Sequence, residues 1–84
     1  MDQPGYHLSK IPKGIVGTSS KIREELAELE DAEKQNCKIM VLVELSDLYG
    51  AIELYLNNNF PSIKMEDLQT MSAITQRAFI NGHR

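Results

Sequence analysis

The sequence contains a single cysteine, Cys37, no tryptophan and no long hydrophobic run. One cysteine excludes a disulfide within the chain and the cysteine spacings of common zinc sites. The apolar segment 39–43 is too short to cross a bilayer, and the polar residues 1–10 show no secretion signal. We therefore expect a cytoplasmic protein in a reducing environment, with no membrane partner.

The chain also lacks an excess of positive charge. Nine basic and twelve acidic residues give a formal net charge of −3, which argues against a nucleic-acid partner. A hydrophobic content of 42% and a charged content of 25% are typical of a folded helical domain. Because 84 residues bury a limited core, we expect one domain, residues 1–84, completed by self-association as a homodimer or homotetramer.

Helix breakers and hydroxyl caps divide the sequence into an arm and three helices. Proline and glycine recur within 1–18 and predict a short irregular N-terminal arm. Hydroxyl groups at Thr18 to Ser20 favour a first helix over 19–34, and residues 35–37 predict a turn into a second helix over 38–57. Pro61 and Gly82 bracket a third helix over 64–81. We expect an all-α fold, a small helical bundle of about three helices per chain.

Two acids interrupt the most apolar helix. Glu44 and Asp47 lie one helical turn apart and flank an apolar stripe that runs through Val41, Leu45 and Leu48. Neighbouring carboxylates beside a hydrophobic seam repel each other and resist desolvation unless a cation or hydrogen-bond donors compensate them. These two acids therefore need a partner of opposite charge.

The first helix repeats the arrangement. Ile22, Leu26 and Leu29 form its apolar stripe, and Glu25 and Glu28 take the same offsets from it. If the two helices pack antiparallel through these stripes, the four carboxylates converge. We expect Glu25 and Glu44 to be the more deeply buried pair. Carboxylate oxygens in such a group are the ligands of a Mg²⁺ or Mn²⁺ site.

The same residues resemble a known family. Glu24-Glu25-Leu-Ala-Glu28, followed by Glu44-Leu-Ser-Asp47, is similar to the EExxE…ExxD signature of the MazG-like nucleotide pyrophosphohydrolases. The resemblance implies Mg²⁺-dependent or Mn²⁺-dependent cleavage of a nucleoside triphosphate between its α and β phosphates. It also implies that Glu25, Glu28, Glu44 and Asp47 are the metal ligands.

The remaining candidates have two interpretations each. Glu24 is either a hydrogen-bond acceptor or water-activating group beside the ligands, or a solvated helix acid. Lys13, Arg77 and Arg84 either hold the outgoing pyrophosphate or are solvated surface charges. His7 either reaches the acidic groove or packs in the arm, and we expect the packing role.

Two other functions remain open. The acids of 24–33 are also typical of the exposed face of an amphipathic helix, so the chain could be a non-catalytic helical interaction module or a nucleotide-binding sensor. In the second helix, apolar residues such as Val43 and Leu54 lie off the stripe and predict an interface. Gly50 in that helix predicts close approach of another backbone or of a ligand.

Overall fold

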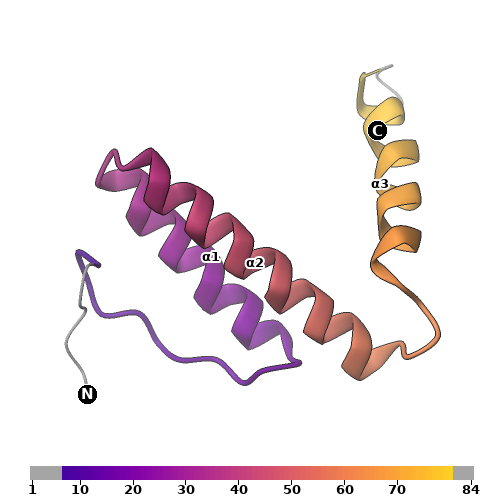
Figure 1. Ribbon diagram of the computed structural model, residues 1–84, viewed down its shortest axis with the longest axis horizontal. Helices are drawn as coiled ribbons and strands as arrows, with labels where there is room; N and C mark the ends of the chain where they lie inside the picture. Colours follow the sequence, from indigo (N-terminus) through magenta and orange to yellow (C-terminus); the bar gives the residue numbers. More distant parts are fainter. Residues whose placement is uncertain (1–6, 81–84) are drawn as a thin grey trace.

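The computed structural model describes residues 7–80, without the side chains of 78–80, and contains three helices (Figure 1). They are α1 (Ser19–Lys34), α2 (Lys38–Asn59) and α3 (Met65–Ile80). No strand occurs in this part of the chain, so the all-α prediction is confirmed. The limits of α1 agree with 19–34, α2 continues two residues beyond the expected 57, and α3 begins one residue later than 64. The end expected at residue 81 lies outside the described residues.

Local hydrogen bonds fix the ends of α1. The Thr18 hydroxyl accepts a hydrogen bond from the Ser20 amide, which confirms the predicted N-terminal cap. At the other end, the Gln35 amide donates to the carbonyl of Asp31. Asn36 then takes φ 57°, a left-handed conformation that asparagine tolerates, and the chain reverses into α2. The two helices therefore lie antiparallel and side by side (Figure 1).

The N-terminal arm runs back along α1 (Figure 1). Its Gly14 amide donates to Glu24 Oε1 at 2.8 Å. A Cβ at Gly14 would lie 2.3 Å from the carbonyl oxygen of Ser20, so only glycine fits there. Gly17, with φ 85°, turns the chain into α1, and its carbonyl accepts a hydrogen bond from Asn58 Nδ2 at 3.0 Å. The arm is thus attached to both helices.

The faces through which α1 and α2 pack differ from the prediction. Leu26 and Leu45, expected in the two apolar stripes, are 45% and 44% exposed. The buried positions are instead Glu24, Glu25, Asp31 and Ala32 on α1 and Glu44, Ala51 and Leu56 on α2. Glu25 and Glu44 are thus buried where the two helices pack, whereas the bulkier Leu26 and Leu45 point outward.

Many of the described apolar side chains of α2 and α3 are therefore exposed. The exposed large hydrophobic residues of these two helices are Ile39, Leu42, Val43, Leu45, Tyr49, Leu54, Met71 and Ile74. α3 extends away from the α1–α2 pair and does not pack extensively against either (Figure 1). Gly50 has open space around it, so none of the described residues makes the close approach expected there. No helix in the described part of the chain has the length and apolar character needed to cross a membrane.

Candidate metal centre

Four carboxylates from α1 and α2 converge at the interface between the two helices. Glu25 and Glu28 project from α1, and Glu44 and Asp47 project from α2. One oxygen of each lies within 4.8 Å of the corresponding oxygens of the other three. Two ligands about 2.1 Å from one ion lie about 3.0 Å apart when adjacent in an octahedron and about 4.2 Å apart when opposite. The predicted convergence of the four acids is confirmed, and its upper limit of 4.8 Å is somewhat wider than these ligand separations. We call these residues the four-carboxylate group.

The members of this group lie at different depths. The Glu44 residue is 0% exposed and Glu25 is 5% exposed. Glu28 is half-buried and Asp47 is exposed. The expectation that Glu25 and Glu44 form the deeper pair is confirmed. An ion held here would be approached by solvent or substrate from the side of Asp47.

Lys21 compensates part of the charge. Its Nζ lies 3.0 Å from Glu25 Oε2 and 3.1 Å from Glu24 Oε1. The hydrogen bond to Glu25 is the main reason that the pKa of Lys21 is raised above its usual value. Sequence analysis did not identify this residue, although a lysine four positions before a glutamate on a helix is the spacing that brings such a pair together.

Glu25 Oε1, in contrast, is buried and has no hydrogen-bond partner among the described residues. A buried carboxylate oxygen without a donor costs free energy that a cation or a donor would recover. The side chain is 7% exposed, and the residue contributes an oxygen to the four-carboxylate group. A cation or a hydrogen-bond donor at the group would satisfy this oxygen.

Burial and the crowding of these negative charges raise the pKa of Glu28. Burial, followed by the negative charge of Glu25, a hydrogen bond with Glu24 and the charge of Glu44, raises the pKa of Glu28 from 4.5 to about 7. Near neutral pH and without metal, Glu28 shares its proton with the neighbouring Glu24 carboxylate. A divalent cation would displace that proton.

Glu24 is buried but acts differently from the ligands. Burial alone would raise the pKa of Glu24, but the hydrogen bonds from the Gly14 amide and from Lys21 outweigh it and leave this pKa lowered. Its second oxygen lies 3.8 Å from Lys13 Nζ. Glu24 therefore attaches the arm to α1 and borders Glu28, which fits the acceptor role better than the solvated-acid or water-activating role.

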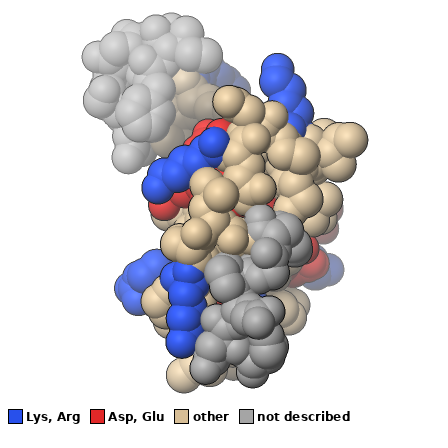
Figure 2. Space-filling view, turned by 90° about the vertical axis from the view of Figure 1, so that its left-hand side faces the viewer, with Lys and Arg blue, Asp and Glu red and all other residues tan. Residues whose placement is uncertain are grey.

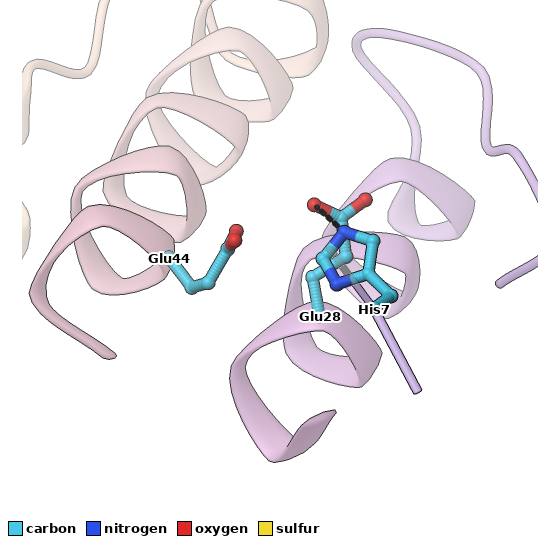
Figure 3. Close-up of side chains that lie close together, drawn as sticks. All are labelled: His7, Glu28 and Glu44. Carbon is cyan, nitrogen blue, oxygen red and sulfur yellow. Dashed lines mark ion pairs between the residues drawn. The ribbon is translucent and has the colours of Figure 1, made fainter. Parts of the chain in front are cut away.

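Two residues beside the group were not assigned there from the sequence. Asp31 is buried and accepts hydrogen bonds from the amides of Leu8 (2.8 Å) and Ser9 (3.3 Å). His7 lies beside Glu28 (Figure 3). Its Nε2 atom is 3.6 Å from Glu28 Oε1. His7 is therefore packed in the arm, as expected, and also lies at the acidic groove. No periodicity in 1–18 could have revealed this, because the arm is irregular.

Among the described residues, the cations proposed for pyrophosphate, Lys13 and Arg77, do not lie at the group. The Lys13 side chain is 86% exposed and its ion-pair partner is Glu24. Arg77 is exposed on α3, the helix that extends away, and Arg84 lies outside the described residues. Lysine and arginine side chains lie beside small acidic areas on the face shown in Figure 2. Lys21 is paired with Glu25, a member of the four-carboxylate group.

A groove of about 550 Å³ lies between α2 and the beginning of α3. It is lined by Tyr49, Lys64, Met65, Glu66, Leu68, Gln69 and Ser72. None of the four carboxylates borders it. The groove is therefore separate from the candidate metal centre within one chain.

Comparison of the chain with known protein families, with curated proteins and with solved structures finds no match. The resemblance to the MazG-like enzymes therefore rests on the acids and their spacing in this sequence.

Proposed function

We propose that the protein is a nucleoside triphosphate pyrophosphohydrolase that uses Mg²⁺, or Mn²⁺ in its place, and releases a nucleoside monophosphate and pyrophosphate. The observation that carries the proposal is the convergence of Glu25, Glu28, Glu44 and Asp47. The unsatisfied Oε1 of Glu25 supports a cation there independently of the acid spacing. The reaction itself comes from the resemblance to the MazG-like enzymes.

The residues of the group would divide the work by depth. Glu25 and Glu44, which are buried between the two helices, would fix the position of the cation. Lys21 would orient Glu25 through the contact of its Nζ atom with Glu25 Oε2. Asp47 and Glu28 lie nearer to solvent, where a triphosphate can approach. When bound, the cation supplies charge neutralisation for the phosphates and lowers the pKa of an attacking water.

Self-association is part of the proposal. The fully buried apolar residues among those described are Ala32, Ala51 and Leu56, a small core for a stable domain. The exposed apolar residues of α2 and α3 would supply the missing buried area if a second copy covered them. A homodimer or homotetramer would also bring further cations, including those of α3, to the metal centre.

The proposal is tested by measuring pyrophosphate release from the eight common NTPs and dNTPs with and without Mg²⁺. We expect release that requires the metal and is lost in Glu44→Gln. Glu30→Gln and Glu53→Gln are matched controls, because both acids are exposed on the same helices and lie outside the group.

The outcomes separate three functions. Metal-dependent release in the wild type and in both controls supports the enzyme. A rise in melting temperature with Mg²⁺ and nucleotide, without turnover, would indicate a nucleotide-binding sensor. Neither effect would indicate a helical interaction module and would contradict the proposal.

A further inference from the structure

A second set of potential ligands overlaps the four-carboxylate group. One ring nitrogen of His7 and one oxygen each of Glu28 and Glu44 lie within 4.8 Å of one another. Figure 3 shows the three side chains meeting between the arm, α1 and α2. Glu28 and Glu44 belong to both sets, so the two positions adjoin.

The arm holds His7 in this place. The amides of the next two residues, Leu8 and Ser9, donate to the Asp31 carboxylate, so the backbone beside His7 is attached to α1. The imidazole is 14% exposed. Its Nε2 faces Glu28 Oε1 at 3.6 Å, and its Nδ1 faces Asp31 Oδ1 at 3.7 Å.

This order of groups is the one found around metal-binding histidines. A ligand histidine usually directs its second nitrogen to a carboxylate, which orients the ring and raises the basicity of the nitrogen that faces the ion. Here Asp31 is on the Nδ1 side and Glu28 is on the Nε2 side, and one ring nitrogen lies within 4.8 Å of an oxygen of Glu44. In the adjoining four-carboxylate group, which shares Glu28 and Glu44 with this set, the Oε1 atom of Glu25 is buried and has no hydrogen-bond partner among the described residues. A cation between the two helices would satisfy it.

The ligand set determines the kind of ion. Mg²⁺ prefers oxygen ligands and rarely accepts nitrogen, whereas imidazole favours transition ions such as Co²⁺ and Zn²⁺. One imidazole and two carboxylates also leave coordination positions open for water or a substrate oxygen. We propose that His7, Glu28 and Glu44 form a mixed nitrogen and oxygen position for a transition ion, adjoining the Mg²⁺ position. This inference rests on the proposed metal centre and extends it to the N-terminal arm.

The test uses Co²⁺ as the probe and does not depend on activity. Proton NMR of the Co²⁺-loaded protein should contain a strongly shifted signal from the Nδ1–H of a coordinated imidazole, and this signal should disappear in D₂O. It should be absent in His7→Ala and in His7→Gln, which retains bulk and polarity without an imidazole. His83→Ala is the control, since the chain has two histidines, and it should retain the signal.

Calorimetry on the same variants gives the selectivity. His7→Ala should weaken Co²⁺ binding by about tenfold or more, and Mg²⁺ binding by less than about threefold. Mg²⁺ binding without a His7-dependent Co²⁺ signal would overturn this inference and leave the metal centre in place. Failure of the wild type to bind either ion would overturn the metal centre as well.

Discussion

The replacement Glu44→Gln tests whether the buried acids are metal ligands or structural acceptors. Glu44 is fully buried, and its charge contributes to the raised pKa of Glu28. Glutamine keeps the shape of the side chain and removes the charge. Without metal, the variant should therefore be more stable than the wild type, although a buried residue has been changed.

The expected size of the effect can be bounded in two ways. Two unit charges 4.8 Å apart repel by about 3 kcal/mol at an effective dielectric constant of about 20. The rise of the Glu28 pKa from 4.5 to about 7 corresponds to about 3 kcal/mol, shared among burial and three neighbouring acids. Removal of the Glu44 charge alone should recover about 1 kcal/mol, or roughly 4–8 °C in melting temperature.

Thermal unfolding at pH 8, in EDTA and in 10 mM Mg²⁺, measures both consequences. The wild type should be stabilised by Mg²⁺, whereas Glu44→Gln should be more stable in EDTA and unaffected by Mg²⁺. A variant that unfolds in EDTA, or that keeps the full Mg²⁺ effect, would show that Glu44 is a structural hydrogen-bond acceptor and would refute the assignment.

Three further predictions concern pH, the arm and the interface. Because the folded-state pKa of Glu28 is raised to about 7, the contribution of Glu28 to metal-free stability should be full below pH 4.5 and should fall by up to about 3 kcal/mol as pH rises through 7. Urea titrations in Mg²⁺ should not show this loss. Asp31→Asn should destabilise the fold by about 1–3 kcal/mol and speed hydrogen exchange of the Leu8 and Ser9 amides. The control Glu30→Gln should change neither quantity. Equal exchange rates of these amides in the two variants would contradict the arm contacts. Gly50→Ala should stabilise the helix of a single chain by about 1 kcal/mol, because Gly50 has open space around it. If sedimentation instead shows that the variant no longer associates, the added methyl group must clash with a second copy at this position. Leu54→Asp should weaken the same association, and a well-folded wild-type monomer would contradict self-assembly.

Sequence reasoning located the helices because their limits depend on local chemistry. The Thr18 hydroxyl cap and the reversal at Asn36 act through hydrogen bonds and dihedral angles within a few residues. The end of α2 was misplaced by two residues because Asn59 extends the helix, donating from its side chain to the carbonyl of Tyr55.

The packing faces were not predictable in the same way. Helical spacing identifies an apolar side, but it does not state which side the neighbouring helix covers. Leu26 is exposed while Glu25 is buried, because Lys21 and the other acids make that face the interface. The spacing nevertheless predicted which four acids converge in the structure. Asp31 was not identified, and the position of His7 at the groove was not the one expected, because the contact between them depends on the path of an irregular arm.

The central claim is tested most directly by hydrolysis of a nucleoside triphosphate in H₂¹⁸O, with mass analysis of both products. Attack of water on the α-phosphorus predicts one ¹⁸O atom in the nucleoside monophosphate, unlabelled pyrophosphate, and no reaction in EDTA. Label in the pyrophosphate, release of orthophosphate, or no Mg²⁺-dependent cleavage of any nucleotide would contradict the account.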